Sequence, residues 1–326
     1  MFSKGRNTFI SSGLMLTSNL VCWILIGAFI TGCGDGEDKK AAAQVQVSRT
    51  EKPVVFVSIP PQRTFVREIA GDRPEIHVMV KPGHSPATYE PTPKQMIALA
   101  TAHLYLRTGV PFESAWMDRI RAANPRMLVI NTAQDIKRRA MERHYHQASG
   151  RQHAEGHDKM HSSDSHKDPH VWLAPDLVKK QADTICHALQ KIDPYNTHKY
   201  ETNLVAFQQR LDDLDNYIRQ KLQGLENRTF MVFHPSWGYF ADSYNLEQFA
   251  VEIEGKEPGG KALANIIDRA RKLNIDTIYV QPQFSQASAK TIAQAIDAEI
   301  VVLDPLSDDY FTNLRRAADM LAAKDE

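Results

Sequence analysis

Residues 196–222 read NTHKYETNLVAFQQRLDDLDNYIRQKL, and this stretch divides the chain into two parts. Its apolar side chains recur every three or four residues, which predicts one long helix with a single buried stripe. The stripe consists of Tyr200, Leu204, Phe207, Leu211, Leu214, Ile218 and Leu222. A helix rises about 1.5 Å per residue, so this one would span about 40 Å. Since that length exceeds one small domain, we expect the helix to brace two.

On both sides of this helix, short apolar runs alternate with segments of helical spacing. The expected strands are 53–61, 75–80, 103–109 and 126–131 before it, and 228–235, 249–253, 276–282 and 299–305 after it. The expected helices between them are 63–71, 94–102, 112–124 and 174–193, then 238–245, 261–274, 290–298 and a final helix. Such alternation predicts an α/β fold, in which each half is a mostly parallel sheet flanked by helices.

The beginning of the chain has the pattern of an export signal. Lys4 and Arg6 are the only charges before Cys33, and the apolar core LVCWILIGAFI at 20–30 is short for a membrane span. The end of this segment, ITGC at 30–33, resembles a bacterial lipobox, which predicts a lipid on Cys33. We expect residues 1–32 to be a lipoprotein signal peptide and 33–51 a flexible linker. An ordinary buried apolar segment or a membrane anchor is the alternative.

Charge and cysteine content limit the partners. The 39 basic and 39 acidic residues cancel, and loss of residues 1–32 would leave 37 against 39, a net charge of −2. With no basic excess, nothing favours binding to nucleic acid. Cys22 lies in the signal and Cys33, at its end, is the expected site of the lipid. Cys186 is left alone, which excludes an internal disulfide and a thiolate metal cluster. A metal ion here must therefore be held by nitrogen and oxygen.

Four candidate metal ligands stand at or just past apolar strands, or open a helix: His84, His170, His234 and Asp304. Loops at the carboxyl ends of parallel strands form the usual ligand crevice, so these side chains would converge if the two halves face each other. Three imidazoles and one carboxylate suit Zn²⁺, whereas Mn²⁺ sites lean further toward carboxylates. Their spacing matches no short zinc signature. Polar capping or surface exposure, and a simple turn at Asp304-Pro305, are the alternatives.

Longer motifs carry a family resemblance. GHSPATYEPTP, DPHVWLAP, FHPSWGYFADSYNL and VVLDPL, in that order, resemble the zinc/manganese class of ABC-transporter solute-binding proteins across residues 52–322. The resemblance implies two four-stranded α/β lobes joined by one long rigid helix, with the metal between them. The corresponding boundaries are 52–193 for the first lobe, 194–223 for the connecting helix and 224–326 for the second lobe.

The resemblance also implies the ligands. His170, His234 and Asp304 match the family's motif positions, and histidine rather than glutamate at the position of His234 favours zinc over manganese. The first loop departs from the pattern, because Ala87 occupies the usual ligand position and His84 lies three residues earlier. We take His84 as the ligand from this loop. Glu90 is a rival oxygen ligand, or else a cap for the helix that follows, and water is a third possibility.

The function that this resemblance implies is capture and delivery of a metal ion. The protein would bind Zn²⁺, less readily Mn²⁺, outside the cytoplasm and pass it to an ABC permease with its ATPase. We expect a monomer held to membrane lipid through Cys33, in the periplasm or on the outer face of the cytoplasmic membrane. Affinity should fall as the pH drops through about 6.5, because protons compete for imidazole.

Two other classes of protein are alternatives to this one. A metal-dependent hydrolase needs an open metal position and a general base, and the sequence has no HExxH or comparable pairing. A closed shell of four ligands also argues against an enzyme. A metal-buffering or adhesive surface lipoprotein that works without a transporter is the other alternative, and the sequence separates it poorly from the first reading.

The segment before His170 is rich in histidine. His144, His146, His153, His157, His161 and His166 lie among Ser, Gly, Lys, Asp and Gln residues. Their irregular spacing predicts a loop at 143–167 that captures zinc weakly or senses high zinc, with a merely solvated insertion as the alternative.

Three residues near the expected ligands have two interpretations each. Asp168 either holds the second ring nitrogen of His170 or only opens a turn. Trp237 and Tyr239 either line the cleft or belong to the core.

Overall fold

The computed structural model describes residues 46–141, 167–253 and 255–323. The predicted signal peptide, Cys33 and the six histidines of the 143–167 segment lie outside these residues. Within the described residues, no helix is long and apolar enough to cross a membrane. The chain is already packed at Val47, whose side chain is buried and whose N–H donates to the carbonyl of Ile192 at 2.8 Å.

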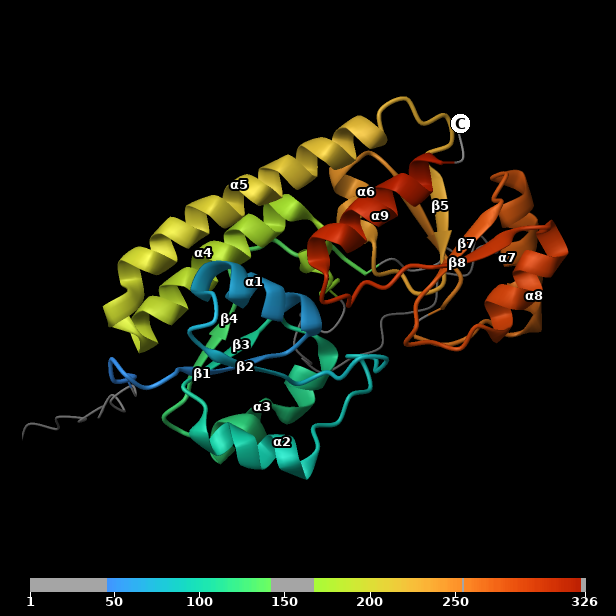
Figure 1. Ribbon diagram of the computed structural model, residues 1–326. Helices are drawn as coiled ribbons and strands as arrows, with labels where there is room; N and C mark the ends of the chain where they lie inside the picture. The colour runs from blue at the N-terminus through green and yellow to red at the C-terminus, as the bar shows by residue number, and fades with distance from the viewer. Residues whose placement is uncertain (1–45, 142–166, 254, 324–326) are drawn as a thin grey trace, which may run out of the picture. The chain divides into compact units, whose positions relative to one another are not determined.

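Two four-stranded parallel sheets form the framework, which confirms the predicted α/β fold (Figure 1). The first contains β1 (Val54–Val57), β2 (Glu75–Val78), β3 (Leu104–Arg107) and β4 (Leu128–Asn131), in the order β2-β1-β3-β4. The second contains β5 (Thr229–Val232), β6 (Glu247–Ala250), β7 (Thr277–Val280) and β8 (Glu299–Val302), in the order β6-β5-β7-β8. Both orders reverse direction beside the first strand, and ligands bind at the carboxyl ends of strands at such a point.

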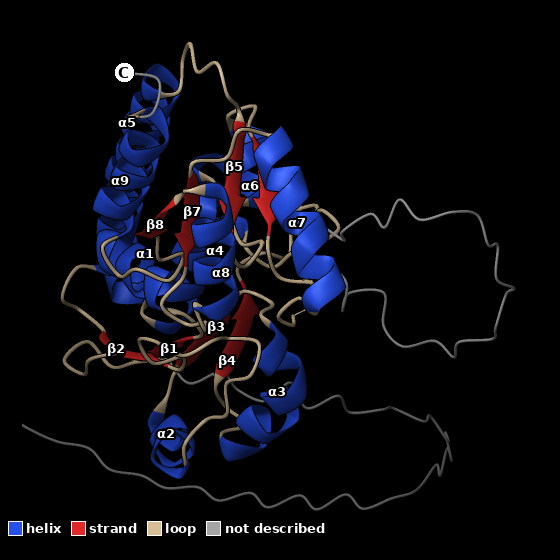
Figure 2. Cartoon of the chain, turned by 90° about the vertical axis from the view of Figure 1, so that its right-hand side faces the viewer, coloured by secondary structure: helices blue, strands red, loops and turns tan. Residues whose placement is uncertain are grey.

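Prolines begin the helices of the first lobe. These are α1 (Pro60–Ala70), α2 (Pro93–Ala98), α3 (Pro111–Ala123) and α4 (Pro175–Ile192). Proline fits the first helical turn because its missing N–H has no partner there. The predicted strand at 53–61 is therefore too long: β1 ends at Val57, and the prolines that follow open α1. Helices α2 and α3 cover one face of the first sheet and α1 and α4 the other (Figures 1 and 2).

The long helix α5 (Thr197–Lys221) confirms the predicted stripe. Tyr200, Phe207, Leu211, Leu214, Ile218 and Leu222 are buried, and Leu204 is partly buried. The helix lies along α4 (Figure 1) and also contacts α1 and α9 (Tyr310–Ala322). Three short 3-10 helices, η1 (Leu99–Thr101), η2 (Val171–Leu173) and η3 (Pro194–Asn196), complete the first part of the chain.

Alternate residues of the second sheet face two different cores. Phe230 and Val232 of β5 belong to the large core shared with α5, α9 and the first lobe. Met231 and Phe233 point to the opposite face, against α7 (Gly260–Lys272) and α8 (Ala287–Ile296). A short helix, α6 (Gly238–Ser243), follows β5.

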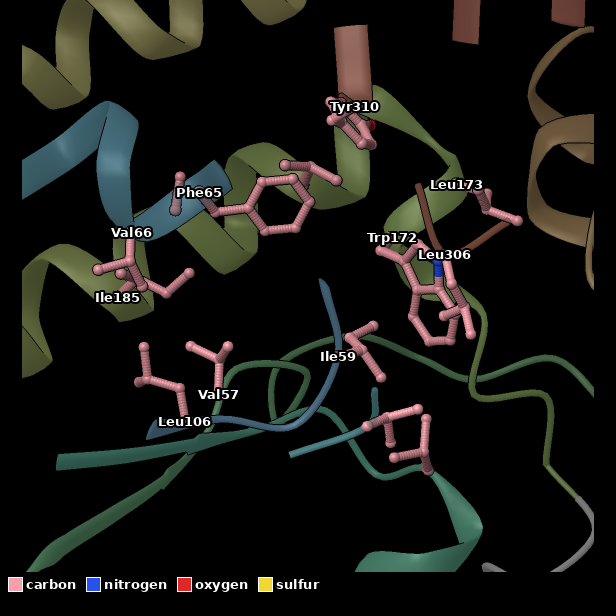
Figure 3. Close-up of a cluster of buried hydrophobic side chains, with 14 of the residues drawn as sticks. Val57, Ile59, Phe65, Val66, Leu106, Trp172, Leu173, Ile185, Leu306 and Tyr310 are labelled. Atoms are coloured by element: carbon pink, nitrogen blue, oxygen red, sulfur yellow. The ribbon is translucent and has the colours of Figure 1, made fainter. Parts of the chain in front are cut away.

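The large core is continuous from one lobe to the other. Figure 3 shows Phe65 of α1 and Tyr310 of α9 in the same cluster, with Trp172 beside Leu306. The rings of Phe65 and Tyr310 meet edge to face with centroids 5.0 Å apart. The two sheets are therefore held by shared burial as well as by the connecting helix.

Candidate metal site

His170 lies just before η2 and is 8% exposed. Its Nδ1 is 2.7 Å from Oδ1 of Asp168, and the same oxygen accepts the backbone N–H of His170 at 3.0 Å. A carboxylate only accepts hydrogen bonds, so Nδ1 carries the proton and Nε2 keeps a lone pair for a metal. Of the two interpretations of Asp168, the structure thus supports the one in which its carboxylate holds the second ring nitrogen of His170.

Burial also tunes the charge of His170. Desolvation lowers the pKa of its imidazole below the ordinary value, against the opposing attraction of Asp168. A lowered pKa keeps the ring neutral at neutral pH, which is the form that binds metal.

His234, two residues beyond β5, is held in the same way. Its Nδ1 is 2.8 Å from Oε2 of Glu252, and its ring stacks on Phe284 with centroids 4.7 Å apart. Gln281 fixes the backbone, because its Oε1 accepts the N–H of His234 at 3.0 Å and its Nε2 donates to the carbonyl at 3.1 Å. This imidazole, too, offers Nε2.

The two histidines lie next to each other although they come from different lobes. Their ring centroids are 5.2 Å apart, with 73° between the ring planes. Each ring is held from behind by its own carboxylate. The structure therefore presents two pre-oriented imidazole nitrogens at the meeting point of the lobes.

Asp304 stands two residues beyond β8 in a loop with many hydrogen bonds. Its Oδ1 accepts Nε2–H of Gln283 at 2.7 Å and the backbone N–H of Leu306 at 2.9 Å. Asn313 donates to its carbonyl at 2.7 Å. The hydrogen bonds of this carboxylate and of its backbone carbonyl thus come from residues of its own lobe.

His84 lies in an exposed loop. Its Nδ1 is 3.2 Å from the carbonyl of Pro82, and its ring meets Tyr89 edge-on with centroids 5.8 Å apart. Glu90 is exposed as well, and the cap of α2 is Thr92, whose Oγ1 accepts the N–H of Gln95 at 3.4 Å. The predicted helix cap at Glu90 is therefore wrong.

The four predicted ligands are not gathered into one cluster. Of the side chains that the structure describes, no three His, Cys, Asp or Glu residues are close enough to hold one metal ion. His170 and His234 are brought together, and neither His84 nor Asp304 joins them in such a group. The ligand set as a whole stays a prediction.

Both aromatic residues after His234 are buried. Trp237 is fully buried and packs edge-on against Phe240, so it belongs to the core. Tyr239 is 6% exposed, and its hydroxyl donates to the carbonyl of Asp168 and accepts the N–H of Arg139, both at 3.0 Å. Tyr239 therefore supports the carboxylate behind His170 from the opposite lobe.

Sequence reasoning missed Glu252, Gln283 and Phe284. The strand expected at 249–253 would have included Glu252, but β6 ends at Ala250 and Glu252 lies beyond it. Val232 of β5 pairs with Ala250, so His234 and Glu252 stand at the same level past adjacent strands. In the second lobe, each strand is followed within three residues by one member of the site: His234, Glu252, Gln283 and Asp304. A search for polar residues at or just past every expected strand end would have found Glu252 and Gln283, whereas Phe284 carries no such signal.

Two lobes built on parallel sheets, with histidine and carboxylate side chains just past the strand ends, define the class of two-lobed α/β solute-binding proteins. Residues 55–324 match the family described as ZnuA, zinc-uptake complex component A, periplasmic, and the chain belongs to this family. The match confirms the predicted α/β fold and the predicted membership in a family of metal-binding ABC-transporter solute-binding proteins.

Curated relatives agree with this assignment. The high-affinity zinc uptake system protein ZnuA of Bacillus subtilis is 30% identical over 316 residues, covering 94% of this chain and 90% of the relative. The zinc-binding protein AdcA of Streptococcus pyogenes is 26% identical over 302 residues, covering 85% of this chain and 56% of the relative. The chain thus spans little more than half the length of AdcA.

Solved structures are similar as well. A crystal structure of ZnuA has 38% sequence identity to this chain and a TM-score of 0.75. The match covers 85% of this chain and 100% of that one. A ZnuA deletion mutant with zinc bound has 39% identity and a TM-score of 0.74, over 83% of this chain and 97% of that one. The periplasmic zinc-binding protein TroA of Treponema pallidum, at 20% identity and a TM-score of 0.71 over 84% and 99% of the two chains, shows the fold alone.

Proposed function

We propose that this protein binds Zn²⁺ outside the cytoplasm and delivers it to an ABC permease, with Mn²⁺ the less favoured ion. The observation that carries the proposal is the pair of carboxylate-held imidazoles, His170 and His234, whose ring centroids are 5.2 Å apart. Neutral imidazole is a favoured Zn²⁺ ligand. The relatives of this protein in Bacillus subtilis and Streptococcus pyogenes are named for zinc uptake and zinc binding, respectively.

The proposed ligands are Nε2 of His170, Nε2 of His234, the carboxylate of Asp304 and the imidazole of His84. His84 lies in an exposed loop, where its Nδ1 is 3.2 Å from the carbonyl of Pro82. Glu90 or water are the alternatives at that position. Four such ligands close the coordination shell, so the protein is a carrier rather than an enzyme.

Metal titration tests the ligand set. The mature chain, residues 33–326, should bind one Zn²⁺ tightly by calorimetry, and His170→Ala or His234→Ala should abolish that site. His84→Ala and Asp304→Ala should weaken it strongly, whereas His187→Ala, on the exposed side of α4, should not change it. Absence of a tight Zn²⁺ site, or a clear preference for Mn²⁺, contradicts the proposal. Unchanged affinity in His84→Ala alone assigns the fourth position to Glu90 or water.

The proposed partners are the permease with its ATPase, and membrane lipid bound through Cys33. We expect the chain to be a monomer in the periplasm or on the outer face of the cytoplasmic membrane. The ITGC motif supports the lipid anchor. Cys33→Ser should abolish metabolic labelling with a fatty acid in the host cell. Labelling that persists in the variant rules the anchor out.

The histidine-rich segment is proposed as an auxiliary zinc-capturing loop, separate from the tight site. Deletion of residues 144–166 should remove weak Zn²⁺ binding events from the titration and leave the tight one unchanged. Loss of the tight event would show that the segment and His170 act as one site.

A further inference from the structure

The carboxylate of Asp304 has one occupied oxygen and one available oxygen. Oδ1 accepts two hydrogen bonds, from Nε2 of Gln283 at 2.7 Å and from the N–H of Leu306 at 2.9 Å. Among the residues described, none donates to Oδ2. A carboxylate bound in this way can offer a metal only one oxygen without losing two hydrogen bonds.

Within the described residues, the Gln283 side chain makes a hydrogen bond only to Asp304. Because Oδ1 of Asp304 accepts, the near atom of the amide must be the donor Nε2. The other amide atom, Oε1, is buried and has no hydrogen-bond partner in the described part of the chain. The bond to Asp304 is therefore what orients the Gln283 amide, across 21 residues of sequence.

The loop after β7 holds two of the proposed ligands at once. Gln281 clamps the backbone of His234 through two hydrogen bonds, and Phe284 stacks on its ring. Gln283, between them, holds Asp304. One short loop thus sets the position of the imidazole that follows β5 relative to the carboxylate that follows β8.

Every oriented ligand is left with one donor atom. Asp168 and Glu252 occupy Nδ1 of the two histidines, and Gln283 with Leu306 occupies Oδ1 of Asp304. Single-atom donors favour the four-coordinate tetrahedron of Zn²⁺, whereas the larger, oxygen-rich shell of Mn²⁺ profits from a carboxylate that binds through both oxygens.

We propose that Gln283 is a specificity-determining positioning residue: it restricts Asp304 to binding through Oδ2 and thereby favours Zn²⁺ over Mn²⁺. This inference rests on the proposed function, since it requires Asp304 to be a ligand. It assigns metal choice to a side chain that does not touch the metal. Leu306 contributes through its backbone N–H, so Gln283 is the one side chain in this pair of donors, and its replacement removes one of the two hydrogen bonds to Oδ1.

The test replaces Gln283 with leucine, which keeps similar bulk and removes the donor. Zn²⁺ and Mn²⁺ dissociation constants are measured by competition with chromogenic chelators. We expect the preference for Zn²⁺ over Mn²⁺ to fall about tenfold in Gln283→Leu, the lower range for residues that orient a metal ligand. Gln286→Leu is the matched control, because Gln286 is the N-cap residue of α8 and makes no side-chain cap hydrogen bond.

The visible absorption of bound Co²⁺ reports the coordination number of the metal, and a loss of folding stability alone does not change it. Four-coordinate Co²⁺ absorbs visible light much more strongly than five- or six-coordinate Co²⁺. The Co²⁺ form of Gln283→Leu should therefore absorb more weakly than the parent and Gln286→Leu. An unchanged spectrum together with an unchanged Zn²⁺/Mn²⁺ ratio overturns the inference, even if the metal-free variant unfolds more easily.

Asp304→Ala separates the two proposals. If Asp304→Ala binds Zn²⁺ as tightly as the parent, Asp304 is not a ligand, and both the ligand set and the role of Gln283 fail. If Asp304→Ala binds weakly while Gln283→Leu keeps the ratio and the spectrum, the proposed function stands and the role of Gln283 alone fails.

Discussion

Glu252 and Asp168 make the same contact with two different histidines, each through a carboxylate oxygen within 2.8 Å of Nδ1. Such outer carboxylates orient the ring and make Nε2 a better ligand. At the scale of single residues, the site therefore depends on side chains that are not themselves proposed ligands.

Glu252→Gln should lower Zn²⁺ affinity about tenfold, because an amide oxygen accepts the Nδ1 proton of His234 more weakly than a carboxylate does. Chelator competition on the mature chain measures the change. Glu247→Gln, an exposed change at the start of β6, serves as the control. Equal affinities in the two variants would mean that the carboxylate does not support His234.

The helix α5 shows how far local pattern alone predicts an element. The stripe over 200–222 was visible as apolar spacing, and the same residues line the core. The boundaries were less accurate elsewhere: the strand expected at 249–253 is β6 at Glu247–Ala250. An apolar run continues past the end of a strand when the following loop is also buried, as at Val251 after β6. Hydrophobicity alone therefore places the end of the strand too late.

Leu214→Ala should lower the free energy of unfolding by about 2–5 kcal/mol, because it empties a fully buried position of α5. Val205→Ala on the same helix is the matched control, since Val205 is 68% exposed and its loss should cost under about 0.5 kcal/mol. Chemical denaturation of the metal-free protein measures both. Similar losses in the two variants would contradict the assignment of the buried face.

Several contacts between the lobes converge on the loop that follows β8. Trp172 donates from Nε1 to the carbonyl of Pro305 at 2.8 Å, and Arg63 pairs with Asp308, its Nε lying 3.1 Å from Oδ1. Both partners belong to the loop that carries Asp304. At the scale of the whole molecule, the first lobe thus helps to place a proposed ligand of the second.

Trp172→Phe should destabilise the protein by about 1–2 kcal/mol more than Trp237→Phe does. Both tryptophans are buried, but only Trp172 has a hydrogen bond to lose, because Nε1 of Trp237 has no partner in the part of the chain described. Denaturant unfolding of the metal-free variants measures the difference. Equal destabilisation would mean that the bond to Pro305 does not hold the lobes together.

The sequence by itself determined the alternation of strands and helices, the connecting helix and the residue types of the proposed ligands, because each of these is a local pattern or an ordered motif. Only the tertiary structure decided that His170 and His234 adjoin, that both offer Nε2, and that Gln283 occupies one oxygen of Asp304. The contacts of Glu252 with His234 and of Gln283 with Asp304 join residues 18 and 21 positions apart. Parallel strands bring such residues together through their register, which no local pattern encodes.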